Sequence, residues 1–253
     1  MYLSSRNIGR SLVNGAPPKR VDRATKRVRA LKTNPSDIRQ APLVILDFDG
    51  TVTAEDTGVH LLRRLARGDW QSLEKEYLAG RIGSRDCIRQ MWQLLPHDQD
   101  TVEKVIAEVP IDPHTSKLIN SIKAAGAEVL IVSDGFGIAV RKVASELSIA
   151  VLTNIVDWST GEISFPHGNS ACPCALCGTC KETPVRAARL EGRRVVVVGD
   201  GRSDLRAAMI ADAVFAKGHL QKLCRESDIP FTPFNNFKEL LEPLRKAISF
   251  SSG

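Results

Sequence analysis

The sequence contains no apolar run that approaches the roughly 18 residues of a membrane-spanning helix, so we expect no membrane span. Its first 41 residues contain only two acidic residues against ten lysines and arginines, and they lack the apolar segment of a secretory signal. The remaining residues lack a basic excess, with 25 lysines and arginines against 27 acids. The net charge of +6 therefore belongs to the N-terminal segment, and we do not expect the rest of the chain to bind nucleic acid.

The N-terminal segment, residues 1–41, has scattered basic residues and no long apolar period, so we predict a disordered extension with a short basic helix over 21–31. An organelle transit peptide or an upstream translation start would also fit this composition. We expect a cytoplasmic protein, because a cluster of cysteines later in the chain favours a reducing compartment. Attraction of this segment to RNA or to an anionic partner is an alternative, which deletion of residues 1–40 would test.

The stretch 43–51, LVILDFDGT, is the strongest signal in the chain. Its four apolar residues suit a central parallel strand that is covered on both faces. Asp47 and Asp49 are two residues apart and would point to the same side of an extended chain. Such a pair suits a nucleophile that forms an aspartyl-phosphate and a general acid/base beside it. Taken alone, the stretch is also compatible with an acidic turn after a strand.

Three later segments point the same way. The run 129–135, VLIVSDG, predicts a second strand, followed by a hydroxyl and amides that can hold a phosphate. The run 195–204, VVVVGDGRSD, predicts a third strand followed by Asp200 and Asp204. Carboxylates at neighbouring strand ends form an all-oxygen site suited to Mg²⁺. Lys181 lies between these two strands in the sequence and would neutralise the phosphate and the nucleophile, although most lysines are solvated surface charges.

These motifs, in this order, resemble those of the haloacid dehalogenase superfamily of phosphatases, over roughly residues 42–250. The resemblance implies that Asp47 is the nucleophile and Asp49 the general acid/base. It also implies an Mg²⁺ ion on Asp47, the backbone carbonyl of Asp49 and Asp200, with Asp204 in support. The residues implied to bind the substrate phosphate are Thr51, Ser133, Asp134 and Lys181.

Helical patterns fill the region between the first two motifs and predict a small cap, residues 55–125 including a return helix. The catalytic core is then 42–54 and 126–253. A cap in this place resembles the phosphoserine-phosphatase-like branch, whose arginine clamp for the substrate carboxylate falls at Met91 and whose acidic partner falls near Asp56. A thioether cannot replace a guanidinium, so phosphoserine is disfavoured, although an arginine nearby could compensate. Asp56, Met91 and Trp92 are the candidates for the substrate pocket.

A cysteine-rich loop, residues 165–181, ends at the phosphate-binding lysine. Four soft ligands, Cys172, Cys174, Cys177 and Cys180, suit a structural zinc ion. Reduced thiols or a disulfide remain alternatives, because zinc sites usually take their ligands from separated segments. This loop and the segment 215–237 resemble the methionine-salvage phosphatases that act on 2-hydroxy-3-keto-5-methylthiopentenyl-1-phosphate. Met91 and Trp92 would suit the apolar methylthio end of that substrate.

We therefore predict an α/β, Rossmann-like fold with a parallel sheet, helices on both faces and a helical cap inserted after the first strand. The expected activity is Mg²⁺-dependent hydrolysis of a small phosphate monoester. Another metabolite, such as phosphoserine, phosphocholine or pyridoxal phosphate, is an alternative substrate. A non-catalytic binding protein is the alternative from another class, and the intact set of acids argues against it. The sequence does not determine the oligomeric state.

Overall fold

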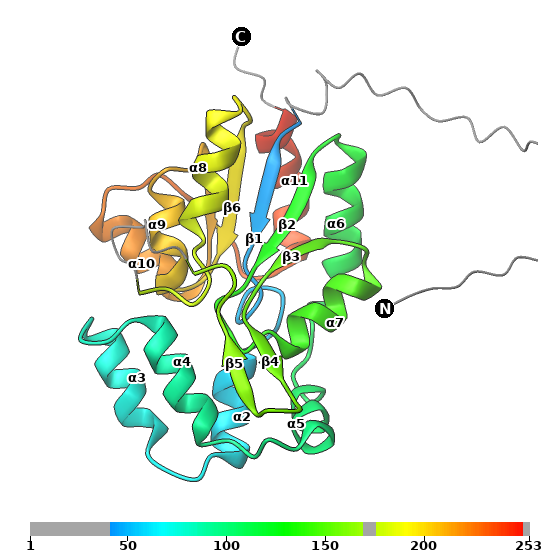
Figure 1. Cartoon of the computed structure of the whole chain (residues 1–253). Coiled ribbons are helices and arrows are strands. Elements are labelled where there is room, and N and C mark those ends of the chain that lie inside the picture. Colours follow the sequence, from blue (N-terminus) through cyan, green and yellow to red (C-terminus); the bar gives the residue numbers. More distant parts are fainter. Residues whose placement is uncertain (1–40, 169–175, 250–253) are drawn as a thin grey trace, which may run out of the picture. The chain divides into compact units, whose positions relative to one another are not determined.

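A six-stranded parallel sheet forms the centre of the structure (Figure 1). The computed structural model describes residues 41–168 and 176–249. The strands are β1 (Leu43–Leu46), β2 (Glu128–Val132), β3 (Ala150–Leu152), β6 (Val195–Gly199), β7 (Ala213–Ala216) and β8 (Thr232–Pro233), in the order β3-β2-β1-β6-β7-β8. Because every pairing is parallel, the carboxyl ends of these strands meet at one edge of the sheet, where ligands bind in such folds.

Helices cover both faces of the sheet, and the alternation along β1 shows why. Val44 and Leu46 pack into one apolar cluster with α6 (Thr115–Ala124), α7 (Ile138–Glu146) and α11 (Phe237–Ser249). Leu43 and Ile45 pack on the other side. That side carries α8 (Glu182–Leu190), the 3₁₀ helix η1 (Arg202–Asp204), α9 (Leu205–Ala208) and α10 (Gly218–Glu226). The continuous apolar runs are therefore strands buried on both faces, and the predicted fold is confirmed.

A second, smaller layer lies over the carboxyl edge of the sheet (Figure 1). It contains four helices between β1 and β2: α2 (Thr57–Leu65), α3 (Trp70–Leu78), α4 (Ser84–Gln93) and α5 (Gln99–Ile106). Aspartates cap three of them, since Asp56, Asp69 and Asp98 accept hydrogen bonds from the amides three residues later. Apolar side chains of these helices form a cluster of their own around Trp92.

An antiparallel hairpin, β4 (Ile155–Asp157) and β5 (Glu162–Ser164), belongs to the same layer. Its buried residues Val156 and Ile163 join the cluster around Trp92, although they lie outside the predicted cap, 55–125. The hairpin was not predicted, because each strand has three residues and buries one of them, which is too short for a periodic pattern.

Two sequence predictions fall on residues that the structure does not describe. The basic extension lies almost wholly within residues 1–40, and the cysteine-rich loop includes residues 169–175; neither range is among the described residues. Among the described residues, no helix combines the length and the apolar character that crossing a bilayer requires.

Candidate active site

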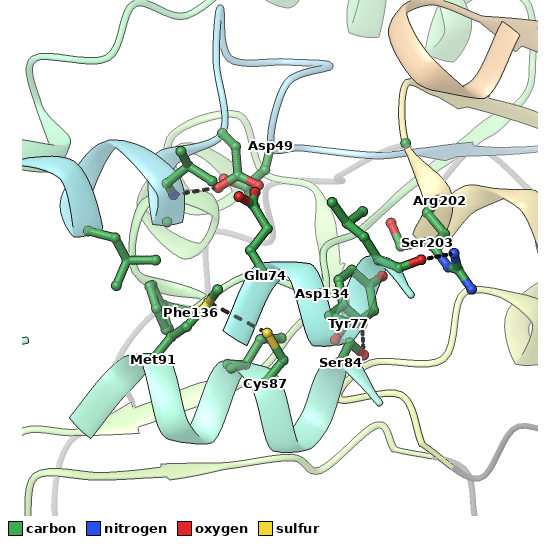
Figure 2. A pocket seen from close by; sticks show the side chains of 18 of the residues that line it. Asp49, Glu74, Tyr77, Ser84, Cys87, Met91, Asp134, Phe136, Arg202 and Ser203 are labelled. Carbon is green, nitrogen blue, oxygen red and sulfur yellow. Dashed lines mark hydrogen bonds between the residues drawn. The ribbon is translucent and has the colours of Figure 1, made fainter. Parts of the chain in front are cut away.

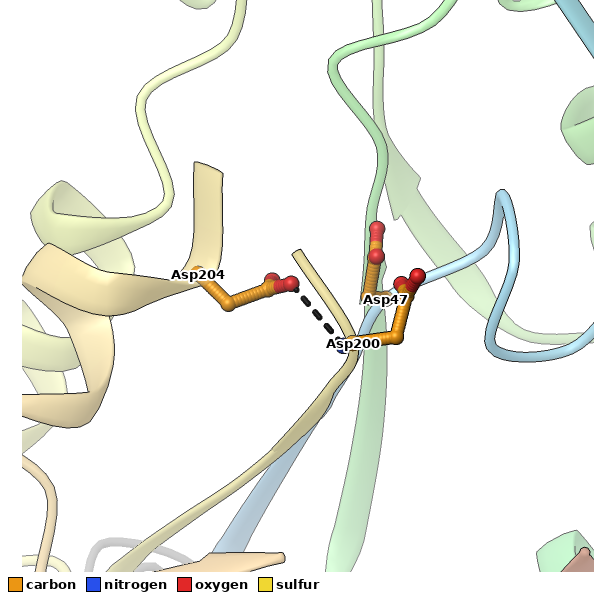
Figure 3. Close-up of side chains that lie close together, drawn as sticks. All are labelled: Asp47, Asp200 and Asp204. Carbon is orange, nitrogen blue, oxygen red and sulfur yellow. Dashed lines mark hydrogen bonds between the residues drawn. The ribbon is translucent and has the colours of Figure 1, made fainter. Parts of the chain in front are cut away.

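Three aspartates converge at the carboxyl edge of the sheet (Figure 3). Asp47 follows β1, Asp200 follows β6, and Asp204 ends the 3₁₀ helix η1. One carboxylate oxygen from each lies within 4.8 Å of the others. Asp204 is held by the amides of Asp200 and Gly201, which donate to its Oδ2 atom at 3.2 and 3.0 Å. The sequence motif therefore folds so that acids from two strands share one small site.

The Lys181 ammonium joins this cluster from the start of α8. Its Nζ atom lies 2.5 Å from Asp47 Oδ1 and 2.7 Å from Asp204 Oδ1. Burial alone would lower the pKa of Lys181, but the two carboxylates raise it above its ordinary value, so the lysine stays charged. Burial, and then repulsion from Asp204, raises the pKa of Asp47. One ammonium does not balance three carboxylates, which leaves a negative charge for a cation to neutralise.

The donor set fits a hard divalent cation, because all of its side-chain ligands are carboxylate oxygens. Gly50 and Thr51 pack closely against Asp200, one of these acids. Gly50 has φ +76°, and a Cβ atom there would lie 2.5 Å from Asp200 Oδ2. The Thr51 hydroxyl donates to Asp200 Oδ1 at 2.9 Å. Thr51 is thus buried against an acid of the cluster, and its predicted contact with the phosphate stays a prediction.

The Asp49 carboxylate accepts hydrogen bonds from α2 and from the loop after β2. It accepts hydrogen bonds from the Thr57 hydroxyl at 2.5 Å and the Thr57 amide at 3.2 Å, at the start of α2. The Ser133 hydroxyl, after β2, donates to Asp49 Oδ2 at 3.0 Å and accepts from the Gly135 amide at 3.1 Å. The structure therefore brings together Asp49 and Ser133, which lie 84 residues apart in the chain.

Asp134, which was predicted to contact the phosphate, forms hydrogen bonds with three other residues. Its carboxylate accepts hydrogen bonds from the Ser84 hydroxyl at 2.5 Å and the Thr179 amide at 2.6 Å, and a longer one from Asn154 at 3.4 Å. Burial raises the pKa of this carboxyl. Sequence reasoning missed Ser84, Thr179 and Asn154, because each lies 20 to 50 residues from Asp134 and none belongs to a local motif.

A cavity of about 440 Å³ opens between this edge of the sheet and the helices above it (Figure 2). This volume suits a small metabolite. Its polar lining residues are Asp47, Asp49, Asp56, Glu74, Tyr77, Ser84, Asp134, Asp200, Arg202, Ser203 and His219. Its apolar and sulfur-bearing side chains are Val59, Leu62, Leu78, Cys87, Ile88, Met91 and Phe136. The cavity thus joins the acidic cluster to an apolar wall.

The predicted pocket residues divide between the cavity and the core. Asp56 and Met91 line the cavity. Desolvation of its carboxyl, and then repulsion from Asp49, raises the pKa of Asp56 to about 7, although the residue as a whole keeps an exposed surface. Trp92 is not among the lining residues. Trp92 is fully buried, and its indole N–H donates to the Gly161 carbonyl at 2.9 Å. Met91 and Trp92 point in different directions because consecutive residues of a helix are rotated by about 100°.

The cysteine-rich loop contacts α4. The Arg85 guanidinium donates to the Cys177 carbonyl at 3.1 Å, and the Gly178 amide donates to the Ser84 hydroxyl at 3.2 Å. Cys180 is buried next to Lys181. Cys172 and Cys174 lie outside the described residues, so the four-cysteine zinc site stays a prediction.

The chain is similar to one known protein family and to several known proteins. Residues 44–209 match the haloacid dehalogenase-like hydrolase family. The chain is 32% identical to a 2-hydroxy-3-keto-5-methylthiopentenyl-1-phosphate phosphatase of Exiguobacterium sibiricum, over 80% of this chain and 95% of that protein. A protein of the same name from Brevibacillus brevis is 29% identical, over 81% and 95%. A substrate-bound phosphoserine phosphatase has a similar fold, with a TM-score of 0.62, 22% identity and coverage of 81% and 98%.

Proposed function

The chain belongs to the haloacid dehalogenase-like hydrolases, and from this we propose that it is a phosphatase in which Asp47 attacks the phosphorus of a small phosphate monoester. The observation that carries the proposal is the hydrogen bond from the Lys181 ammonium to Asp47, a residue that follows β1 and lines the cavity. A buried carboxylate beside a buried ammonium suits a nucleophile that must approach an anionic phosphoryl group.

The proposed roles follow from the contacts of each side chain. Lys181 offsets the charge of Asp47 and of the phosphoryl oxygens, which lowers the repulsion between them. Asp49 would donate a proton to the leaving oxygen and then accept one from water, and its bonds from Thr57 and Ser133 fix its orientation for both steps. Splitting the hydrolysis into attack and release of an aspartyl-phosphate gives two easier steps.

Magnesium is the proposed cofactor. Asp47, Asp200 and the backbone carbonyl of Asp49 would hold the ion, with Asp204 in support. When bound, Mg²⁺ supplies charge neutralisation to the transferring phosphoryl group. The zinc site on the four cysteines and the cytoplasmic location stay predictions, and metal analysis of protein purified under reducing conditions would test the zinc site.

For the substrate we propose 2-hydroxy-3-keto-5-methylthiopentenyl-1-phosphate, the compound in the names of the relatives. The apolar wall of the cavity supports this choice. Cys87 and Met91 bring two sulfur atoms within 3.7 Å of each other on that wall. Polarisable sulfur and hydrophobic side chains suit a methylthio end, whereas a thioether at position 91 offers no partner to the carboxylate of phosphoserine.

Asp47→Asn tests the reaction. We expect kcat/KM for this ester and for 4-nitrophenyl phosphate to fall at least about a thousandfold, while the circular-dichroism spectrum stays that of the unmodified protein. Asp100→Asn, an exposed position on α5, is the matched control and should keep full activity. Undiminished turnover by Asp47→Asn would exclude the assigned nucleophile.

A further inference from the structure

Two polar side chains on α3 face the cavity. Glu74 and Tyr77 both line it and are half-buried. They lie three residues apart, on the same face of the helix. Neither side chain has a hydrogen bond or an ion pair with another described residue. Glu76 shows the contrast, because its carboxylate accepts two hydrogen bonds of 2.6 Å from Arg81 away from the cavity.

The two groups offer complementary hydrogen-bonding properties. A carboxylate such as that of Glu74 accepts hydrogen bonds only. Burial, and then the charge of Asp134, raises the pKa of Tyr77 above its ordinary value, so its hydroxyl remains a donor. Figure 2 shows the Glu74 side chain pointing from α3 into the cavity, and Tyr77 on the same helix closer to Asp134. An acceptor and a donor at this spacing suit a ligand that carries both a hydroxyl and a carbonyl.

The charge of the cavity adds a second constraint. Beyond the acidic cluster, the wall carries the Glu74 carboxylate, and Asp56 with its raised pKa adds little negative charge at neutral pH. Arg202 also lines the cavity, and its guanidinium keeps its positive charge at the end of α3, where it donates to the Leu78 carbonyl at 2.7 Å. In a confined space of low dielectric constant, an unpaired carboxylate repels an anionic group and leaves a neutral one unaffected. A ligand that carried a carboxylate beside Glu74 would therefore bind poorly.

We propose that Glu74 and Tyr77 are specificity-determining residues, which bind the hydroxyl and the carbonyl of a hydroxy-keto phosphate ester whose only charged group is its phosphate, and that Glu74 excludes esters bearing a carboxylate. This inference rests on the proposed phosphatase function and deepens it. Two residues of α3 then select the substrate, and the cluster around Asp47 carries out the reaction. A quaternary ammonium group is a poorer fit, since it has no N–H group to donate to Glu74 and no acceptor for the Tyr77 hydroxyl.

The test measures kcat and KM of the full-length protein with Mg²⁺ for two esters. One is 2-hydroxy-3-keto-5-methylthiopentenyl-1-phosphate and the other is 3-phosphoglycerate, which carries a carboxylate and no ammonium group that Glu74 would attract. Glu74→Gln should lower kcat/KM for the first about tenfold and raise it for the second about tenfold, as expected for one charged hydrogen bond lost and one repulsion removed. Tyr77→Phe should lower kcat/KM for the hydroxy-keto ester about tenfold, mainly through KM.

Glu76→Gln is the matched control, because it removes the same charge from the same helix on the side of Arg81. It should leave the ratio of the two kcat/KM values within about twofold. An unchanged ratio in Glu74→Gln, no detectable 3-phosphoglycerate turnover by that variant, or an equal shift in Glu76→Gln would overturn the inference. Turnover of 4-nitrophenyl phosphate by the unmodified protein keeps these outcomes separate from failure of the phosphatase function itself. If Glu74→Gln does not fold, the Tyr77→Phe result decides.

Discussion

The Ser84 hydroxyl, on the first residue of α4, donates a hydrogen bond of 2.5 Å to Oδ2 of Asp134, which follows β2. The same hydroxyl accepts the Gly178 amide at 3.2 Å, and Oδ1 of Asp134 accepts the Thr179 amide at 2.6 Å. The helical layer, the sheet and the loop that ends at Lys181 therefore meet at one hydrogen-bonded point. A small hydroxyl thereby links cap and core beside the proposed catalytic lysine.

Ser84→Ala should weaken this link. Removing the buried Ser84 hydroxyl leaves the half-buried Asp134 carboxylate with one partner fewer, which we expect to lower the free energy of unfolding by about 1–3 kcal/mol. Urea titration measures the change. Ser159→Ala is the control, because that hydroxyl bonds Asp157 on the exposed turn of the hairpin, and it should change stability by less than about 0.5 kcal/mol. Equal effects of the two variants would show that the link contributes nothing particular.

Gly50→Ala should damage the acidic cluster. An alanine at φ +76° is strained by about 1–2 kcal/mol, and its Cβ would lie 2.5 Å from the carboxylate of Asp200. We expect the Mg²⁺ concentration for half-maximal activity to rise about tenfold, as for changes that displace a metal ligand. Gly126→Ala has the same strain at φ +78° and no atom within 4 Å, so it should lower stability without changing that concentration. A matching rise in Gly126→Ala would refute the steric explanation.

Mg²⁺ should stabilise the folded protein. The cation offsets the excess charge of Asp47, Asp200 and Asp204 and has no such site in the unfolded chain. At a hundredfold excess over its dissociation constant, binding adds about 2.7 kcal/mol, which corresponds to a rise in Tm of about 5–10 °C. Differential scanning fluorimetry against EDTA measures it. Asp200→Asn should abolish most of the rise and Asp100→Asn should keep it. A full rise in Asp200→Asn would place the ion elsewhere.

Two helix caps should respond to pH with opposite signs. The pKa of Asp56 rises from 3.8 to about 7 on folding, so the unfolded chain releases this proton first. The contribution of Asp56 to stability is then present below about pH 4 and is lost as the pH rises to about 7. Asparagine keeps the cap and removes the titration. Both proteins are measured in EDTA. The Tm of Asp56→Asn minus the Tm of the unmodified protein should therefore increase as the pH rises from about 4 to about 7.

Asp69 caps α3 in the same way, but hydrogen bonds from the Ser72 hydroxyl and amide lower its pKa. Its contribution is present above the ordinary pKa and is lost as the pH falls. Asp69→Asn should therefore lose stability relative to the unmodified protein as the pH rises past 4, the ordinary range of an aspartate. Parallel curves for the two variants would contradict the opposite environments of the two caps.

The local motifs could be predicted because their geometry depends on residues close in sequence. Strand alternation places Asp47 and Asp49 together, and an apolar run of four residues identifies β1 as buried on both faces. The hairpin β4–β5 has no such signature, and its place is determined by packing against Trp92. Met91 and Trp92 are neighbours with similar propensities, and the rotation of α4 places one in the cavity and the other in the core.

The sequence by itself determined the sheet and the order of the acids and the lysine, since each follows an apolar strand or a short motif with its own physical signature. The tertiary structure alone decided which side chains share a space. Ser84 contacts Asp134, and Glu74 and Tyr77 line the same cavity as the acidic cluster, only because helices from another part of the chain pack over one edge of the sheet. Contacts between distant segments depend on the summed packing of the whole chain, which no local pattern encodes.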